Sequence, residues 1–157
     1  MSEQSVKEYL KKYNMDDKII TLPNSIATVA LAAQELGCEE ARIAKTLSFE
    51  LSDRCILIVA AGDTKIDNAK YKAEFGEKAK MISFDDVEEK IGHPVGGVCP
   101  FAAKDDVDVY LDESIKRFTT VFPACGSTNN AIELTPTELE KTTGYTKWID
   151  VCKLKEQ

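Results

Sequence analysis

The chain has 157 residues, of which 43% are hydrophobic, and its formal net charge at pH 7 is −7. This apolar content predicts one globular domain over residues 1–157 and excludes an intrinsically disordered chain. The acidic balance argues against general nucleic-acid binding through a basic face, so we expect no DNA partner, whereas it leaves room for a nucleic acid held at one small site.

Hydrophobic spacing predicts that the first half of the chain mixes helices and strands. The first helix is expected to end near Asn14, and a second to run from a cap at Asn24 or Ser25 to a stop at Gly37, with Ile26 and Ala30 among its inward residues. The other expected elements are a strand over Lys18–Leu22, a helical turn over Glu39–Ala44, strands over Thr46–Leu51 and Cys55–Ala61, the latter buried on both faces, and a helix over Asp67–Phe75.

The second half is predicted to contain several short strands between two helices. Thr135 and Glu138 have the spacing of a capping box, which predicts that the last helix, Pro136–Thr142, begins there. Ser83 is expected to cap a helix over Asp85–Ile91 in the same way. Strands are predicted over Lys80–Ser83, Val107–Leu111, Thr119–Phe122, Ala131–Leu134 and Lys147–Cys152.

The irregular order of helices and consecutive strands favours an α+β fold or a mixed, barrel-like sheet over a doubly wound α/β sheet. The N-terminal segment lacks the apolar core of a signal peptide. Apolar runs such as Ile56–Ala61 are too short to span a bilayer. We therefore expect a cytoplasmic protein with no membrane partner.

The loop Ile91–Phe101 is a candidate wall of a binding site. Gly96 and Gly97 leave its backbone open to close approach, and Pro100 stiffens the chain after them. Tight turns use the same residues for structural reasons, so both interpretations stay open. No phosphate-binding motif of the G-x-G-x-x-G or G-x-x-x-x-G-K-[ST] type is present.

Lys45 is an isolated cation where the chain enters a predicted strand. In one interpretation its stem lies along apolar surface and its ammonium group stays in water. In the other, the ammonium lies beside a pocket and holds an anion or a polarised carbonyl. The residues around it allow either.

The five cysteines are irregularly spaced, without a C-x-x-C pair, and His93 is the single histidine. We therefore expect neither a metal site nor structural disulfides. Cys55 and Cys152 lie in apolar runs and are predicted to be buried. Cys99 and Cys125 lie beside glycine-containing loops and are the candidates for a reactive thiol.

Taken together, the motifs resemble the YbaK/EbsC family, the single-domain relatives of the editing insertion in bacterial prolyl-tRNA synthetase. The resemblance extends from about Val6 to Val151. The matching segments are, in order, A-K-T-L at 44–47, V-A-A-G-D at 59–63, G-x-x-x-G-G-x-x-P-F at 92–101, L-D-E at 111–113, A-C-G-S-T-N-N-A-I-E-L at 124–134 and T-P-T-E-L at 135–139.

The resemblance implies a mixed, barrel-like β-sheet surrounded by helices, and an aminoacyl-tRNA deacylase that acts in trans without a cofactor. The implied substrate is a mischarged tRNA, in particular proline tRNA carrying Cys, Ala or another small amino acid. The implied partners are the acceptor end of the tRNA and, where the tRNA is handed over, prolyl-tRNA synthetase. Relatives specific for alanine carry a histidine in the region matching Phe122–Asn130, and this chain has none there.

The same resemblance implies the site residues. Lys45 is the implied catalytic residue. The implied substrate-binding residues are Gly96, Gly97 and Pro100 in the pocket wall, Gly126 and Ser127 in a second turn facing the pocket, and Thr28 at the border of the amino-acid pocket.

Two alternatives stay open. The chain could be a catalytically silent module that binds charged tRNA or a protein partner. It could also be a thiol-dependent enzyme that uses Cys99 or Cys125, with His93 as the base. If RNA is bound, the lysine-rich stretch Lys65–Lys80 is the candidate contact, although a solvated helix face would have the same composition.

Overall fold

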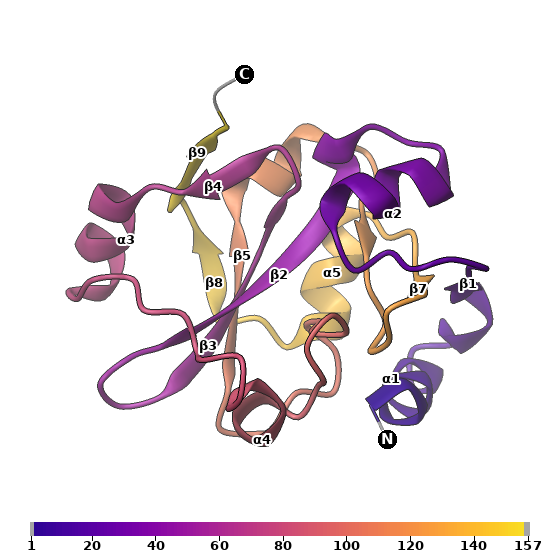
Figure 1. Ribbon diagram of the computed structural model, residues 1–157, viewed down its shortest axis with the longest axis horizontal. Helices are drawn as coiled ribbons and strands as arrows, with labels where there is room; N and C mark the ends of the chain where they lie inside the picture. Colours follow the sequence, from indigo (N-terminus) through magenta and orange to yellow (C-terminus); the bar gives the residue numbers. More distant parts are fainter. Residues whose placement is uncertain (1, 156–157) are drawn as a thin grey trace.

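A five-stranded mixed sheet lies at the centre of the computed structural model, which describes residues 2–155 (Figure 1). The strand order is β6–β2–β3–β5–β8, in which β2 and β3 are antiparallel and the other neighbours are parallel. The bounds are β2 (Ile43–Glu50), β3 (Cys55–Ala61), β5 (Asp108–Asp112), β6 (Phe122–Pro123) and β8 (Lys147–Ile149).

Two short ladders flank this sheet, β1 (Ile20–Thr21) with β7 (Asn130–Ala131) and β4 (Thr64–Ile66) with β9 (Cys152–Leu154). Short 3₁₀ turns cover Asp16–Lys18, Glu40–Arg42 and Glu113–Arg117. The helices are α1 (Ser2–Lys11), α2 (Val29–Leu36), α3 (Asn68–Phe75), α4 (Val87–Ile91) and α5 (Pro136–Thr143). Among the described residues, no helix has the length and apolar character needed to cross a membrane.

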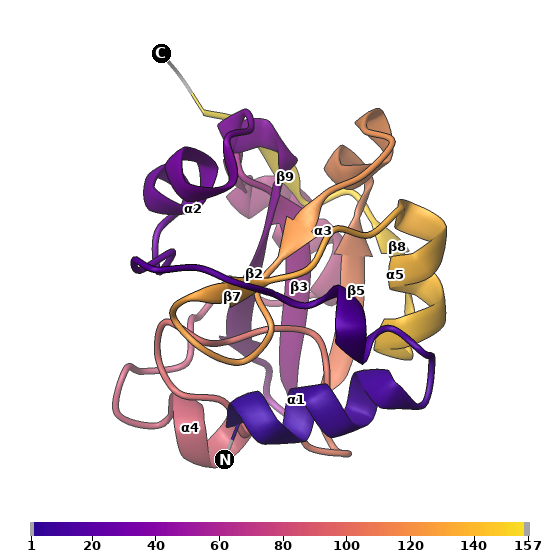
Figure 2. The same ribbon diagram turned by 90° about the vertical axis from the view of Figure 1, so that its right-hand side faces the viewer.

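The sheet is buried on both faces, which fixes the two halves of the core. On one face Leu57 and Val59 of β3 pack in a cluster with residues of α1, α4 and α5. On the other, Ile56 and Ile58 pack with Tyr71 of α3. Figures 1 and 2 show the helices on both sides of the sheet. The expected α+β fold, with a mixed sheet surrounded by helices, is confirmed, as are the bounds and double-sided burial of β3.

The expected start of the second helix was wrong. Thr28 is the N-cap of α2, and its side chain accepts a hydrogen bond from the N–H of Leu31 at 3.2 Å. Asn24 lies in a bend and Ser25 in irregular chain before the helix, where the N–H of Ile26 donates to the Thr128 carbonyl at 2.6 Å. Ile26 is buried outside the helix, and Ala30 is exposed on it.

The start of β2 was also predicted too late. The strand begins at Ile43, because Ile43 and Ala44 pair in parallel with Phe122 and Pro123 of β6. Lys45 is therefore the third residue of the strand and does not lie at its entrance. The partner segment is distant in sequence, so local patterns give no sign of this pairing.

Other boundaries moved for similar reasons. The strand expected at Lys80–Ser83 is a single bridge between Phe49 and Met81. The Ser83 hydroxyl contacts the Asp86 carboxylate at 2.8 Å, so it does not cap α4, which has no side-chain cap. The capping box at Thr135 is confirmed. Four predicted strands are shifted, shortened or split: 107–111 became β5, 119–122 became β6, 131–134 became β7, and 147–152 became β8 and β9.

Candidate functional site

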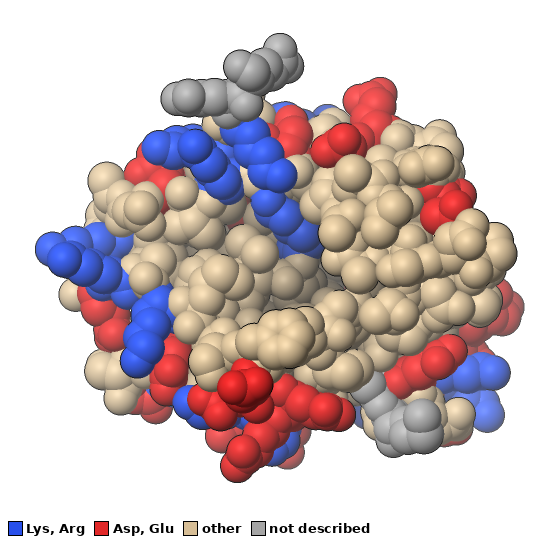
Figure 3. Space-filling view, viewed as in Figure 1, with Lys and Arg blue, Asp and Glu red and all other residues tan. Residues whose placement is uncertain are grey.

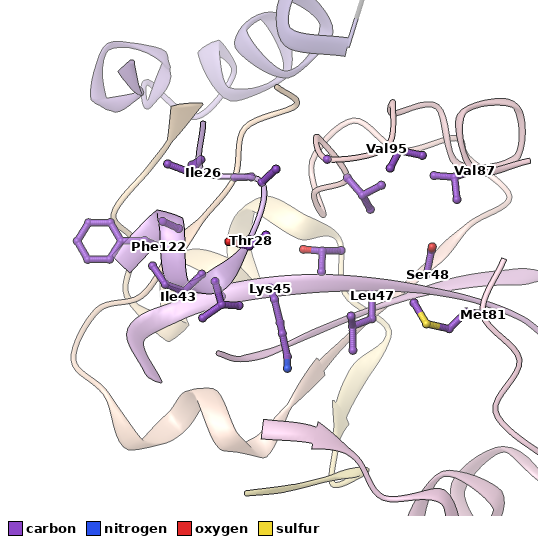
Figure 4. Close-up of a pocket in the computed structure, with 18 of the residues that line it drawn as sticks. Ile26, Thr28, Ile43, Lys45, Leu47, Ser48, Met81, Val87, Val95 and Phe122 are labelled. Carbon is purple, nitrogen blue, oxygen red and sulfur yellow. The ribbon is translucent and has the colours of Figure 1, made fainter. Parts of the chain in front are cut away.

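A pocket of about 360 Å³ lies beside the outer edge of β2 (Figure 4). Its walls come from the start of α2, the segment 81–87, the loop 95–98 and β6, and most of its lining side chains are apolar. The lining includes Thr28, Lys45, Thr46, Phe84, Val95 and Gly96.

Strand β2 has a short opening in its outer edge, where it faces this pocket. On the N-terminal side of the opening, β6 pairs with Ala44. On its C-terminal side, the N–H of Glu50 donates to the Lys80 carbonyl at 2.8 Å, and the Ser48 carbonyl accepts from the N–H of Ile82 at 3.2 Å. Along an antiparallel strand, alternate residues direct their N–H and C=O groups to the same side. Thr46 therefore points its N–H and C=O toward the pocket, as Ser48 and Glu50 point theirs toward 80–82.

Thr46 also brings an unpartnered hydroxyl to the opening. Within residues 2–155, its Oγ1 is a buried side-chain oxygen with no hydrogen-bond partner. No hydrogen bond links the backbone of Thr46 to a described residue outside the strands. Buried polar groups in proteins are nearly always paired, so an unpaired one beside a pocket indicates a place for a ligand group.

Gly96 brings three loops together at the pocket. It has a φ of 86°, and the turn around it is closed by the N–H of Gly97, which donates to the Pro94 carbonyl at 2.9 Å. A Cβ at Gly96 would lie 2.9 Å from the Thr128 methyl group and 3.7 Å from the Ala27 Cβ. A side chain at this position would therefore push the loops apart.

The other predicted wall residues lie behind the lining. A Cβ at Gly97 would meet the Gly126 carbonyl oxygen at 2.9 Å and the N–H nitrogen of Ser127 at 3.1 Å, so these two loops are in backbone contact. Pro100 is buried. Gly97, Pro100, Gly126 and Ser127 thus support the wall from behind, whereas Thr28, Lys45 and Gly96 border the pocket itself.

Lys45 directs its side chain away from the loops. Figure 4 shows Lys45 and Leu47 on the opposite side of β2 from Thr28 and Val95. The Lys45 ammonium donates a hydrogen bond to the Thr64 carbonyl. Burial, and then the nearby charge of Lys155, lower the pKa of Lys45. The ammonium is thus partly buried at the border of the pocket, and it is not an ordinary solvated lysine.

The candidate thiol site is closed. His93 is fully buried, with Nε2 2.7 Å from the Phe101 carbonyl oxygen and 3.6 Å from Cys99 Sγ. Burial lowers the pKa of His93 and raises the pKa of Cys99 to about 12. Burial also raises the pKa of Cys125. A reactive thiolate needs the opposite shift, and none of these residues lines the pocket.

Of the two thiols predicted to be buried, Cys152 is buried and Cys55 is half-buried. Within the described part of the chain, no group of three or more His, Cys, Asp or Glu side chains could hold a metal ion.

Sequence reasoning missed the residues that give the pocket its rim and its polar centre. Phe84 is 74% exposed and Met81 57% exposed at the mouth, and Val95 lies beside them. Large apolar side chains gathered in one exposed patch indicate an interaction surface. The polar centre, Thr46, directly follows Lys45, and its place beside that implied catalytic residue was the one available signal.

Comparison with known proteins finds a matching family, similar sequences and similar solved structures. The family described as "Aminoacyl-tRNA editing domain" matches residues 23–142. Uncharacterized protein YwhH of Bacillus subtilis (strain 168) is 53% identical over 154 residues, which cover 98% of each chain. A solved structure of a proposed trans-editing enzyme for prolyl tRNA synthetase has a TM-score of 0.86 and 28% identity, and the match covers 97% of each chain.

A longer relative contains a similar segment. The proline–tRNA ligase of Bacillus velezensis is 29% identical over 98 residues, which are 62% of this chain and 17% of the ligase. The chain therefore spans a small part of the length of that enzyme.

Proposed function

The chain belongs to the family of aminoacyl-tRNA editing domains, and we propose that it is a deacylase that hydrolyses the ester of mischarged aminoacyl-tRNA in trans. The observation that carries this proposal is the opening in β2, where the unpartnered hydroxyl and the outward-facing backbone groups of Thr46 meet a largely apolar pocket. Such a site suits a small molecule that has an apolar part and a carbonyl group.

The proposed substrate is proline tRNA that carries cysteine, alanine or another small amino acid. Ligand pockets in proteins commonly span about 300–1,000 Å³. The pocket of about 360 Å³ is at the small end of that range, which supports a small aminoacyl group. Because one methylene group is worth only about 1–3 kcal/mol of discrimination, size alone would separate small amino acids weakly.

The chemistry requires orientation more than a strong protein base, since an aminoacyl ester is already activated. The oxygen of a water molecule attacks the ester carbonyl carbon, and the bond from that carbon to the ribose oxygen breaks. The neighbouring ribose hydroxyl passes a proton from the water to the leaving oxygen. The free amino acid and the uncharged tRNA are released.

Residues of the pocket would stabilise and orient these atoms. The N–H groups of Thr46 and Gly96 would donate to the oxygen that becomes negative during the attack. Lys45 would hold the phosphate of the terminal adenosine from the other side of β2. The exposed ring of Phe84 would stack on the terminal base, a contact worth about 1–3 kcal/mol in other proteins.

A silent binding module is the second candidate function. It is favoured by one observation, namely that Lys45 is the single ionisable side chain among the described residues that line the pocket and lies on the opposite side of β2 from Val95. In that case the same pocket would hold charged tRNA, or a protein partner, without turnover. Prolyl-tRNA synthetase as a partner and a cytoplasmic location belong to both proposals.

Deacylation of a panel of labelled aminoacyl-tRNAs would separate the two. The panel includes alanyl- and cysteinyl-tRNA of the proline type, and it compares wild type with Lys45→Ala and with Lys141→Ala on the exposed face of α5. A charge-assisted contact worth about 1.5–3 kcal/mol predicts a loss in kcat/KM of about tenfold to a hundredfold for Lys45→Ala. No turnover of any substrate by folded wild type would leave the binding module.

A further inference from the structure

Three lysines lie on or next to the β4–β9 ribbon beside the pocket, and a fourth reaches it from β2. Lys65 and Lys153 are direct partners in the antiparallel ladder. The N–H of Lys155 donates to the Asp63 carbonyl at 2.9 Å, which extends the pairing and places Lys155 on the same face as Lys153. The Lys45 ammonium contacts the Thr64 carbonyl of the same ribbon. We call Lys45, Lys65, Lys153 and Lys155 the basic strip.

Asp63 and Asp67 lie near enough to interact with Lys45 and Lys153, but no carboxylate within residues 2–155 is in salt-bridge contact with the basic strip. Among the described residues, none of the four lysines forms a salt bridge, and Asp63, the acidic residue in their midst, is held by Arg117 at 2.6 Å. Like charges placed directly opposite each other in a ladder are destabilising, as Lys65 and Lys153 are here. Six other lysines have carboxylate partners, among them Lys70 with Asp150 at 3.0 Å, and further lysines such as Lys7 and Lys141 have none among the described residues; what distinguishes the basic strip is that its four charges lie together. The basic strip therefore suits an anion from outside.

The charge around the pocket is divided between its two sides. Figure 3 shows Lys and Arg side chains running from the region of β4 and β9 to the central hollow, and a cluster of acidic side chains over α4 on the other side. The acidic side chains of that region are Asp85, Asp86, Glu88 and Glu89. A polyanion would be attracted at one side and repelled at the other, which fixes its direction of approach.

We propose that the basic strip docks the phosphates of an RNA acceptor end and directs its 3′ terminus into the pocket, an inference that rests on the proposed function. The strip is one ribbon wide and leads to a pocket, as expected for a single strand of phosphates. A flat anionic membrane would instead bring lipid headgroups against the acidic α4 side. Because the overall charge is −7, phosphate contacts require a local cluster of positive charge such as this strip.

Binding of an uncharged minihelix with a single-stranded 3′ end tests the strip without requiring catalysis. The Lys65→Gln/Lys153→Gln double variant is compared with Lys7→Gln/Lys11→Gln, which removes two exposed charges from α1. Two lost contacts to single-stranded phosphates should lower the slope of log affinity against log salt by about 1.4, which is about sevenfold between 50 and 200 mM salt. The control pair should keep the wild-type slope.

Three results would overturn the inference. The salt slope could fall equally in the two double variants, it could stay unchanged in both, or the protein could bind anionic vesicles and not the minihelix. Removing the opposed charges should not lower the melting temperature. If the double variant nevertheless unfolds, Lys155→Gln at the end of the ladder should lower the slope by about 0.7 on its own, and an unchanged slope there overturns the inference.

A second substrate separates this inference from the proposed function. An amino acid esterified to adenosine alone offers no further phosphates to the strip. The Lys65→Gln/Lys153→Gln variant should hydrolyse that ester as wild type does, while its KM for full-length aminoacyl-tRNA rises. If wild type hydrolyses neither substrate but binds the minihelix in a salt-dependent way, the deacylase proposal is refuted while the inference about the basic strip is supported. Hydrolysis with equal KM for full-length tRNA in both proteins would refute the strip alone.

Discussion

Replacing Thr46 by valine should stabilise the protein and weaken its function at the same time. Valine keeps the branched shape of threonine and removes the hydroxyl, whose oxygen is buried and has no partner among the described residues. An unsatisfied buried polar group costs about 1–3 kcal/mol. Thr46→Val should therefore raise the free energy of unfolding by about 1 kcal/mol. In a chain of this length that is about 2–4 °C in Tm.

Thr143→Val is the matched control for the stability measurement. Its hydroxyl is also buried but donates to the Leu139 carbonyl at 2.7 Å. Losing that hydrogen bond should lower the free energy of unfolding by about 0.5–1.5 kcal/mol. The same chemical change thus has opposite signs at the two positions, and urea unfolding of both variants measures the difference.

The functional half of the prediction uses the deacylation assay. If the polar groups of Thr46 hold the ester, Thr46→Val should lose about tenfold or more in kcat/KM, since a hydrogen bond to a substrate is worth about 0.5–1.5 kcal/mol and misplacement of the ester adds to the loss. Thr143→Val, measured below its own Tm, should retain wild-type turnover. A Thr46→Val variant that is less stable than wild type, or equally active, would refute the assignment of the opening as the ester site.

Three further predictions follow from the same structure. In native protein at pH 8, the partly exposed Cys38 and Cys55 should react with an alkylating reagent. Cys99 is buried, which raises its pKa to about 12, so it should react only after unfolding. Labelling of Cys99 in the native protein would support the thiol-dependent enzyme instead. The hydrogen bond from Arg117 lowers the pKa of Asp63, so their contribution is present above pH 3.8 and lost as the pH falls through the lower folded-state value. Asp63→Asn should accordingly cost less than about 1 kcal/mol at pH 7 in urea unfolding, and its cost should shrink as the pH falls below 3.8; a cost that does not change with pH would contradict this. Phe84→Ala should raise KM for aminoacyl-tRNA about fivefold or more with little effect on Tm, because the ring is 74% exposed; an unchanged KM would remove it from the site.

Local patterns predicted the elements that depend on near neighbours. The capping box at Thr135 and the apolar run of β3 were both read correctly, since helix caps and buried strands are written within a few residues. The start of β2 was not, because Ile43 pairs with Phe122, and no local pattern encodes a partner so far along the chain. Ser83 has cap-like spacing, but its hydroxyl contacts Asp86 and leaves α4 uncapped.

The sequence likewise predicted only some features of the candidate site. The resemblance to the editing family implied that Thr28, Lys45 and Gly96 lie at one pocket, and all three border the pocket in the structure. The side of β2 on which Lys45 lies depends on the strand register, which the sequence does not show. The opening at Thr46 arises from two unrelated segments that end on either side of it, and the basic strip unites Lys65 with a strand near the other end of the chain. The catalytic and binding roles of these residues stay predictions until the assays above are done.

The narrowness of the opening in β2 has a consequence for solubility. Free strand edges invite pairing with another copy of the chain, which is a common route to aggregation. Here β6 covers the edge up to Ala44, and the segment 80–82 covers it again from Ser48. A foreign strand needs a run of several free residues to form a ladder, and the interval between these two segments does not provide one. The protein can thus offer backbone hydrogen-bonding groups to a small ligand while it denies them to a second polypeptide.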